Sequence, residues 1–285
     1  MKVKWKMSNK STFARLCGCS FIHPGRSLHE GLQLVHEFGF SRVDIAVGGS
    51  NAHFSPVEVA QNPRRFADEV RRETEHFALT PNECFVLNFD EPINTPDLKQ
   101  RKETRDLFVG LCEFAQMANF KSVLLIPGPI YPELGERASL DLAVNAFSDL
   151  VKIAISRNLQ LNIEADYESC AHTPEAAKEL CQRVPGLGLT LDYSHFICQD
   201  IAPERIEILH PYTRHIHIRQ AAPGQIVSDV NSGTINYPKV LKQLDESGYG
   251  GLYCIEYLSL DANKSTFARS EKRTREMIGE MEKYI

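Results

Sequence analysis

The stretch Leu187-Gly188-Leu189-Thr190-Leu191-Asp192-Tyr193-Ser194-His195 is an apolar run that ends in a carboxylate, with an imidazole three residues later. Pro185-Gly186 precedes it, and its length and flanks predict a buried strand that stops at Asp192. Because removing an ion from water without compensation is costly, we expect Asp192 to be paired, to bind a metal or to lie on a solvated rim. A simpler interpretation is that Asp192 caps the next turn.

The same alternation of a short apolar strand and a longer amphipathic helix continues along the chain. The pattern predicts strands at 13–20, 42–47, 84–89, 122–126, 159–163, 187–191, 214–218 and 252–256. It predicts helices at 28–38, 63–77, 97–118, 139–157, 174–182, 203–209, 237–247 and 265–283. Eight such units predict an α/β fold, a (β/α)8 TIM barrel that occupies residues 1–285 as one domain, since these barrels run to about 250 residues. The alternative, an open doubly wound sheet, requires a Gly-rich first turn that the sequence does not contain.

Composition restricts the class of protein further. The chain has 42% hydrophobic and 24% charged residues and a net charge of −5, which is typical of a globular protein and argues against nucleic acid as a partner. The eight cysteines follow no metal or disulfide spacing and are expected to be reduced and buried. The basic N-terminus lacks an apolar signal region, and no run of about 18 apolar residues is present, so we expect a cytoplasmic protein with no membrane partner.

Four consecutive predicted strands end in residue types that bind metals: Glu164, Asp192, His217 and Glu256. In a barrel these ends meet at one rim, where catalytic groups lie. Three anions brought together would repel one another unless a cation neutralised them. Oxygen and nitrogen ligands suit one divalent ion, Mn²⁺, Mg²⁺, Co²⁺ or Zn²⁺, better than a thiolate-binding metal, and we expect Mn²⁺ most.

The strand-end motifs resemble those of the xylose isomerase-like barrel superfamily, which includes sugar isomerases and epimerases, hydroxypyruvate isomerase, inosose dehydratase and endonuclease IV. The motifs that carry this resemblance are Ile163-Glu164, Leu191-Asp192-Tyr193-Ser194-His195, His215-Ile216-His217 and Ile255-Glu256. The resemblance covers the C-terminal half well and the N-terminal half only as a general pattern.

The resemblance implies roles for these residues. Glu164, Asp192, His217 and Glu256 would hold the metal, and Glu164 and Glu256 would also form the acid/base pair on opposite faces of the substrate. His195 matches a histidine that contacts a substrate oxygen or a second metal, although a surface loop imidazole is the simpler interpretation.

Some positions depart from the pattern. The ketose 3-epimerases of this superfamily carry an arginine six residues after the ligand histidine, where this chain has Pro223, and Arg219 lies nearer as a substitute that would bind substrate. They also carry a second glutamate six residues after the first, where this chain has Cys170. Asn231 stands where endonuclease IV has a histidine, so a trinuclear zinc cluster and DNA repair are not expected.

Four further features of the sequence are interpreted here. His53, in a Gly-rich loop, would hydrogen-bond a sugar hydroxyl or face solvent. We expect His215 to pack outside the barrel, on the face opposite His217. Residues 9–15, Asn-Lys-Ser-Thr-Phe-Ala-Arg, recur identically at 263–269, first in a strand approach and then at a helix start, with no functional account. The charged C-terminal helix is a solvated face or a contact in a homo-oligomer.

The sequence therefore predicts a divalent-metal-dependent isomerase or epimerase of a small sugar, keto-sugar or polyol derivative, acting through an enediolate. A dehydratase or lyase that uses the same site, including one that eliminates a β-substituent from a keto-glycoside, is the second hypothesis. A non-catalytic carbohydrate-binding or partner subunit is the third.

Overall fold

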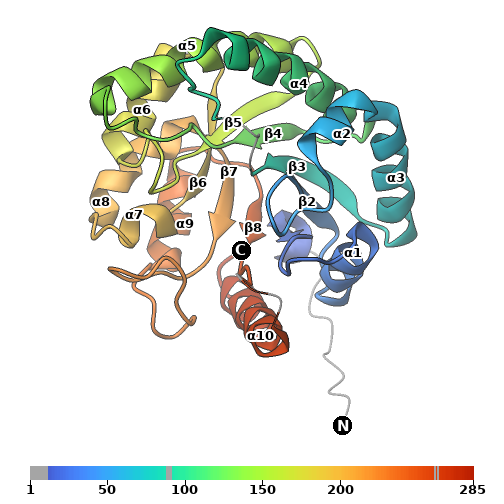
Figure 1. Cartoon of the computed structure of the whole chain (residues 1–285). Coiled ribbons are helices and arrows are strands. Elements are labelled where there is room, and N and C mark those ends of the chain that lie inside the picture. Colours follow the sequence, from blue (N-terminus) through green and yellow to red (C-terminus); the bar gives the residue numbers. More distant parts are fainter. Residues whose placement is uncertain (1–11, 88–91, 260, 262) are drawn as a thin grey trace.

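The computed structural model describes residues 12–87, 92–259, 261 and 263–285. Eight parallel strands form a closed barrel in the order β1 to β8, with β8 pairing back onto β1, and helices surround it (Figure 1). This confirms the expected (β/α)8 barrel. The strands are β1 Leu16–Cys19, β2 Arg42–Val47, β3 Thr80–Val86, β4 Ser122–Leu125, β5 Gln160–Glu164, β6 Gly188–Asp192, β7 Thr213–Ile218 and β8 Tyr253–Ile255.

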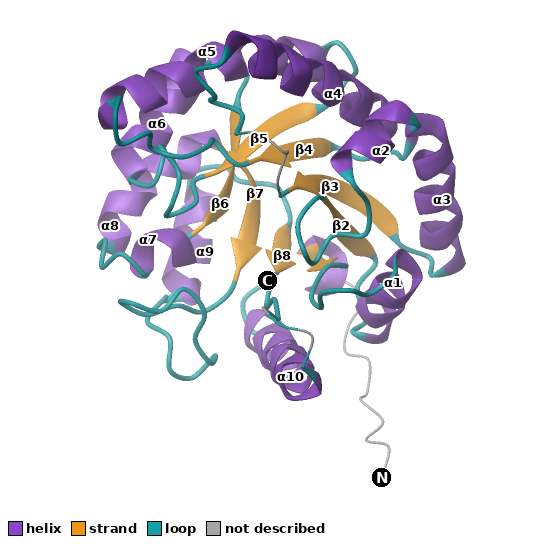
Figure 2. Ribbon diagram, in the orientation of Figure 1, coloured by secondary structure: helices purple, strands orange, loops and turns teal. Residues whose placement is uncertain are grey.

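The helices cover the outer faces of the strands (Figure 2). They are α1 Leu28–Glu37, α2 Pro56–Gln61, α3 Pro63–His76, α4 Leu98–Met117, α5 Gly135–Ile155, α6 Pro174–Arg183, α7 Ser194–Ile197, α8 Pro203–Ile206, α9 Tyr237–Glu246 and α10 Lys264–Met281. Two short 3₁₀ helices, η1 Thr12–Arg15 and η2 Glu207–Tyr212, complete the described elements.

Helix α1 shows how local sequence sets these boundaries. Ser27 and Glu30 form a reciprocal capping box that satisfies backbone N–H groups at the start of the helix. Leu28, Leu32 and Val35 are buried on the face that packs against the barrel. The helix ends before Gly39, whose φ of 92° favours glycine.

The sequence expectations differ from the structure mainly at element starts. Strand β3 begins at Thr80, four residues before the expected start, because the polar segment Thr80–Glu83 extends the ladder beside β2. Helix α2 was not expected, although Ser55 caps it and Pro56 stands at its first position. The end of the expected strand 84–89 reaches residues 88 and 89, which lie outside the described residues.

The repeated heptapeptide takes two structures. Asn263 caps α10 through a hydrogen bond from the Ser265 N–H, so the second copy starts a helix as expected. In the first copy, residues 9–11 lie outside the described part, and Thr12–Arg15 form η1 before β1. The expected strand is therefore wrong for residues 13–15, because the same four residues, Thr-Phe-Ala-Arg, are helical in both copies.

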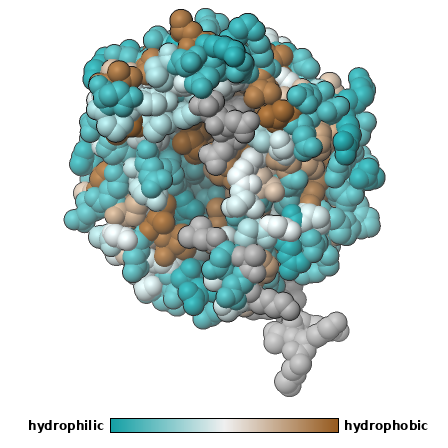
Figure 3. Space-filling model, viewed as in Figure 1, coloured by the Kyte–Doolittle hydropathy of each residue, from teal (hydrophilic) through white to brown (hydrophobic). Residues whose placement is uncertain are grey.

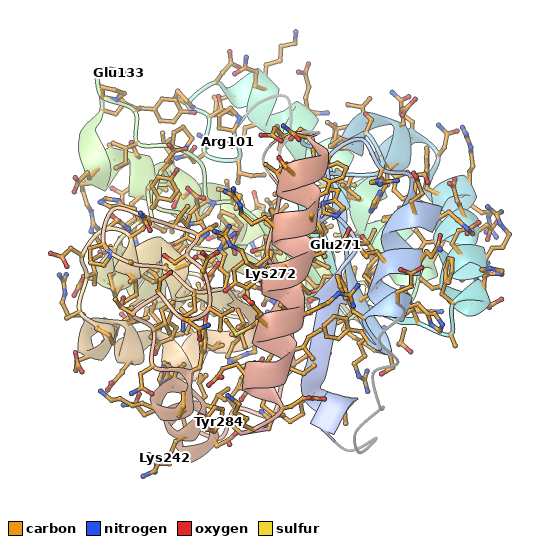
Figure 4. The ribbon with its side chains drawn as sticks, turned by 90° about the horizontal axis from the view of Figure 1, so that it is seen from below. Arg101, Glu133, Lys242, Glu271, Lys272 and Tyr284 are labelled. Atoms are coloured by element: carbon orange, nitrogen blue, oxygen red, sulfur yellow. The ribbon has the colours of Figure 1, made fainter. Side chains whose placement is uncertain are left out.

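Helix α10 runs along the outside of the barrel beside the first strands (Figure 4). Its Glu271 carboxylate lies 3.2 Å from Nε2 of buried His23, which ties the last helix to the loop after β1. None of the described helices is both long enough and apolar enough to cross a bilayer.

The variant Gly110→Ala tests the packing of α4 on α2. A Cβ at Gly110 would lie 2.3 Å from the backbone oxygen of Ala60, so Gly110→Ala requires one helix to move. We expect the free energy of unfolding in urea to fall by about 1–3 kcal/mol. The control is Gly279→Ala on the exposed side of α10, where a Cβ meets no atom within 4 Å and helix propensity predicts a small gain of up to about 1 kcal/mol. Equal stability of the two variants would contradict this packing.

Candidate metal centre and active site

Strands β5 to β8 are neighbours in the barrel, and their C-terminal ends bring four side chains together. Glu164 and Asp192 end β5 and β6, His217 lies one residue before the end of β7, and Glu256 follows β8 directly. Each of the four is buried, and each offers one ligand atom within 4.8 Å of the others. The four residues that the sequence proposed as metal ligands therefore converge at one rim.

His217 lies at the centre of this cluster. Its Nδ1 atom is 2.9 Å from Oε1 of Glu164 and 3.5 Å from Oε2 of Glu256. Asp192 lies beside His217 because the two residues are direct partners in the β6–β7 ladder.

Arg219 supplies a positive charge to the same cluster. Its Nη2 atom lies 2.8 Å from Oδ2 of Asp192, and its Nη1 atom lies 3.2 Å from Oε2 of Glu256. Its Nε atom donates to Ser194 Oγ at 2.8 Å. Arg219 points inward because it lies two residues after His217 on the chain, and residues two apart share a face of an extended segment.

The donor set fits a divalent cation. Oδ2 of Asp192 and Oε2 of Glu256 are buried and accept no hydrogen bond of good geometry from the described residues, although the Arg219 guanidinium lies near both. Buried oxygens with unused lone pairs are costly unless a cation takes them up. Three carboxylates and one imidazole are ligands for Mn²⁺, Mg²⁺, Co²⁺ or Zn²⁺.

The electrostatics reflect burial and mutual repulsion. Burial raises the pKa of Glu164 to about 7, an effect to which Glu256 and Asp192 add and which His217 opposes. Burial likewise raises the pKa of Glu256. Burial also acts to raise the pKa of Asp192, but Arg219, His195, His217 and the hydrogen bond from Ser194 together outweigh it, so the pKa lies below its usual value.

A cavity of about 560 Å³ opens beside this cluster, and Figure 3 shows the hollowed face of the molecule on which it lies. Its polar side is formed by residues from the ends of β5, β7 and β8 and from α7, namely Glu164, Asp166, Tyr167, Glu168, Ser169, His195, Arg219 and Glu256. The side from β3 and β4 is apolar in its described residues, among them Leu87, Ile93 and Ile126.

His195 lines this cavity from α7. Its Nε2 atom lies 2.9 Å from Nη2 of Arg219, and Tyr167 stacks on its ring. Burial lowers the pKa of His195 to about 3, so the ring is neutral at physiological pH. This burial excludes the surface loop interpretation.

His53 is placed differently from the other candidates. Its ring nitrogens lie 2.9 Å from Ser20 Oγ and 3.1 Å from the Arg26 carbonyl oxygen. It does not belong to the described lining of the cavity. The structure therefore does not bring His53 together with the other candidate site residues.

The expectation that His215 packs outside the barrel is wrong. His215 is buried, and its ring lies 5.5 Å from the ring of His217, with Nε2 2.6 Å from Oδ2 of Asp44. The physical reason is the period of a strand, since residues two apart point to the same face. Both histidines of the His215-Ile216-His217 motif therefore point into the barrel.

Sequence reasoning missed two buried carboxylates below the cluster. Asp44 lies in β2 and Glu83 in β3, and both are fully buried. The available signal was a charged residue inside an otherwise apolar strand, as in Arg42-Val43-Asp44-Ile45-Ala46-Val47. A buried charge of this kind requires a partner, which the strand pattern alone does not name.

Arg219→Met tests the charge balance of the cluster. Removing the guanidinium leaves Asp192 and Glu256 buried without their cation, so we expect the metal-free protein to lose about 3–5 kcal/mol of unfolding free energy. Saturating Mn²⁺ should restore part of this loss, because the ion replaces positive charge. The control is Arg205→Met, which removes an exposed ion pair with Glu175 and should cost at most about 1 kcal/mol. An Arg219→Met protein as stable as the control would contradict the assignment.

Comparison with known proteins places the chain among barrels of this type. An uncharacterised protein of Methanocaldococcus jannaschii, MJ1311, is 25% identical, with 93% of this chain and 92% of that protein covered. The crystal structure of a D-psicose 3-epimerase with D-tagatose, from Clostridium cellulolyticum H10, matches with a TM-score of 0.73 and 13% identity over 95% of this chain and 99% of that one. An IOLI protein structure with a bound zinc atom matches with a TM-score of 0.72 and 19% identity over 95% and 99%.

At these identities the solved structures show a shared fold, while a family model covers most of the sequence itself. The model of the xylose isomerase-like TIM barrel family matches residues 32–284. The match includes strands β2 to β8 and the four residues of the cluster, and β1 lies before it. The chain belongs to the xylose isomerase-like TIM barrel family.

Proposed function

We propose that this protein is a divalent-metal-dependent epimerase or isomerase of a small, neutral carbohydrate. One observation carries the proposal: of the four residues in the cluster, Glu164 and Glu256 also line the cavity. Two carboxylates that face the same cavity can act as a general acid/base pair, which removes a proton from a substrate carbon and returns it. The D-psicose 3-epimerase that shares the fold was crystallised with a ketose, which supports a sugar as substrate.

The charge of the site favours a neutral substrate. Glu164, Asp192 and Glu256 carry three negative charges when ionised, which Arg219 and one divalent ion balance. Arg219 is the one lysine or arginine among the described residues that line the cavity, and its guanidinium already lies against two carboxylates. A phosphorylated sugar would add negative charge beside Asp166 and Glu168 without a free cation to receive it.

The metal site is proposed to consist of Glu164, Asp192, His217 and Glu256. A divalent ion held there would supply positive charge that stabilises the negative oxygen developing when the carbon next to a carbonyl loses its proton. The IOLI protein with zinc shows that one barrel of this fold binds such an ion. Among the candidate ions we favour Mn²⁺.

The chain's own residues would divide the remaining work. One carboxylate oxygen of Glu164 faces His217, and one of Glu256 faces His217 and Arg219, which holds each side chain in place. The other oxygen of each group would take the proton from one face of the substrate or return it to the opposite face. His195 and Arg219, joined at 2.9 Å, would bind substrate oxygens on the cavity wall. His53 does not line the cavity, and the proposal gives it no role in substrate binding.

Asp166 gives a specific reason to keep a lyase as the second candidate. It lines the cavity, lies 3.5 Å from His195 Nδ1, and has a pKa raised by burial. In its protonated form, this carboxyl group could donate a proton to a leaving hydroxyl or glycoside oxygen. An epimerase returns the intact carbon skeleton with solvent hydrogen, whereas a lyase releases a β-substituent.

Metal dependence is testable without knowing the substrate. We expect the chelator-treated protein to bind about one equivalent of Mn²⁺ in calorimetric titration. The free energy of unfolding should rise by about 2.7 kcal/mol when free Mn²⁺ reaches about 100 times the dissociation constant. Asp192→Asn should weaken this binding, and Asp229→Asn, at an exposed carboxylate outside the cluster, is the control. Wild-type protein that binds no divalent ion would overturn both enzymatic hypotheses and leave the non-catalytic carbohydrate-binding hypothesis.

Proton exchange tests the two-carboxylate assignment. In D₂O, with a panel of free ketoses that includes D-tagatose and D-fructose, the wild type should exchange the hydrogen at the carbon next to the carbonyl. Glu164→Gln and Glu256→Gln should each fold and lower this exchange by about 10²–10⁴-fold, because neither amide can accept the proton. Glu168→Gln, on the cavity wall but outside the cluster, is the matched control. Exchange at the wild-type rate in Glu256→Gln would rule out this mechanism.

A further inference from the structure

The interior of the barrel contains a second group of charged residues beneath the strand-end cluster. Asp44 of β2, Glu83 of β3 and His215 of β7 are all buried and all lie within 4.0 Å of another charged residue in the barrel interior. Barrel interiors are ordinarily filled by bulky branched side chains. Burying two carboxylates there is costly, so their placement calls for a physical reason.

The Glu83 carboxyl group is held in position by three hydroxyl or amide groups from three strands. Its Oε1 atom accepts hydrogen bonds from Ser122 Oγ and Asn162 Nδ2, both at 2.7 Å. Its Oε2 atom accepts from Thr190 Oγ1 at 2.8 Å. Each of these donors lies in a different strand of β4, β5 and β6, so the carboxylate is fixed in position from several sides.

Asp44 is fixed in the same way. Its Oδ1 atom accepts from Asn82 Nδ2 and from the Glu83 backbone N–H, both at 2.9 Å. Its Oδ2 atom lies 2.6 Å from Nε2 of His215. The two carboxylates therefore have set positions that do not depend on the residues above them.

His217 Nε2 faces both carboxylates. It lies 3.9 Å from Oδ2 of Asp44 and 4.0 Å from Oε2 of Glu83, is buried, and has no hydrogen-bond partner among the described residues. A lone pair on this nitrogen would face two negative oxygens, whereas an N–H group would face two acceptors. Glu164 and Glu256 face Nδ1 at shorter distances. A divalent ion held by the cluster would engage those two carboxylates, and Asp44 and Glu83 would then favour the ring proton on Nε2.

The proton on Nε2 has a consequence for the other ring nitrogen. A neutral imidazole carries one proton, so a proton on Nε2 leaves the lone pair on Nδ1. Nδ1 is the atom that faces Glu164 and Glu256 at 2.9 and 3.5 Å. The lone pair is thus presented to the centre of the cluster.

We propose that Glu83, with Asp44, is a positioning residue that favours the Nε2–H tautomer of His217 and so stabilises the ion-bound form, in which Nδ1 is the ligand atom. The inference rests on the proposed metal-dependent function. Neither carboxylate lines the cavity, so each acts on the metal through His217 rather than by touching substrate. Carboxylate partners of this kind orient a ligating histidine and raise its basicity.

A second ion is the competing explanation for the same residues. Asp44, His215, His217 and Cys254 offer ligand atoms within 4.8 Å of one another. Two observations argue against it: Asp44 and His215 already share a 2.6 Å hydrogen bond, and burial raises the pKa of the Cys254 thiol well above its usual value. An ion there would require the lone pair of His217 on Nε2, the opposite tautomer.

Glu83→Gln is the informative variant. The amide oxygen can still accept from Ser122 and Asn162, and the amide nitrogen would take the place of Oε2, beside the Thr190 hydroxyl and His217. An NH₂ group facing His217 favours a lone pair on Nε2 and moves the proton to Nδ1. We expect the dissociation constant for Mn²⁺, measured by calorimetry, to rise about 10–100-fold.

Ser122→Ala is the matched control. It removes one hydrogen bond to the same buried carboxylate but keeps the charge and the oxygen that faces His217. It should lower the thermal midpoint comparably and leave the Mn²⁺ dissociation constant within about twofold of wild type. Equal Mn²⁺ affinity in Glu83→Gln and Ser122→Ala would overturn the proposal.

A measurement on wild-type protein guards against a variant that does not fold. In ¹⁵N-histidine-labelled protein saturated with Zn²⁺, with the signal assigned by its loss in His217→Gln, Nε2 of His217 should carry a proton and Nδ1 should not. A His217 ring without a proton on Nε2, or binding of a second equivalent of Zn²⁺, would refute the tautomer assignment.

The outcomes separate the two proposals. If wild-type protein binds the ion, Glu83→Gln weakens it and no ketose exchanges hydrogen, the inference holds and the proposed reaction fails. If hydrogen exchange is metal-dependent and Glu83→Gln binds Mn²⁺ as tightly as Ser122→Ala does, the reaction holds and the inference fails. Wild-type protein that binds no divalent ion refutes both.

Discussion

Three carboxylates buried around one imidazole set the main energetic constraint on this molecule. Glu164, Asp192 and Glu256 lie within a few ångströms of one another at the rim of a closed barrel, where water cannot screen their repulsion. The Arg219 guanidinium offsets part of that repulsion. The strands hold these groups rigidly, and the positive charge of Arg219 enters the same space. The stability of the cluster and the proposed binding of a cation therefore depend on the same residues.

The fold and the cluster were accessible from sequence for the same reason. Alternation of apolar strands with amphipathic helices reflects burial of each strand on both faces, which the residue types record directly. Once the barrel is accepted, parallel strands all end at one rim, so a carboxylate or imidazole at the end of each of β5 to β8 has to meet the others. The convergence of Glu164, Asp192, His217 and Glu256 therefore follows from topology alone.

The features that escaped prediction depend on distant contacts or on strand parity. Glu83 sits in the polar segment that opens β3, and only Ser122, Asn162 and Thr190 from three other strands make its burial tolerable. The inward direction of Arg219 and the burial of His215 both follow from the two-residue period of an extended chain around His217. The expectation for His215 was wrong because it placed residues two apart on opposite faces. The start of β3 was missed because its residues are polar, and hydrophobicity marks strands only where the lining is apolar.

Arg219 also has a consequence for ion selection. A single guanidinium fixed between Asp192 and Glu256 leaves the cluster two positive charges short of neutrality. A monovalent ion would leave net negative charge buried, and a trivalent ion would exceed what the three carboxylates can offset. In the proposed metal site, the arginine would therefore set the charge of the bound ion without setting its identity. Metals of equal charge would then compete through their ligand preferences and their abundance in the cell.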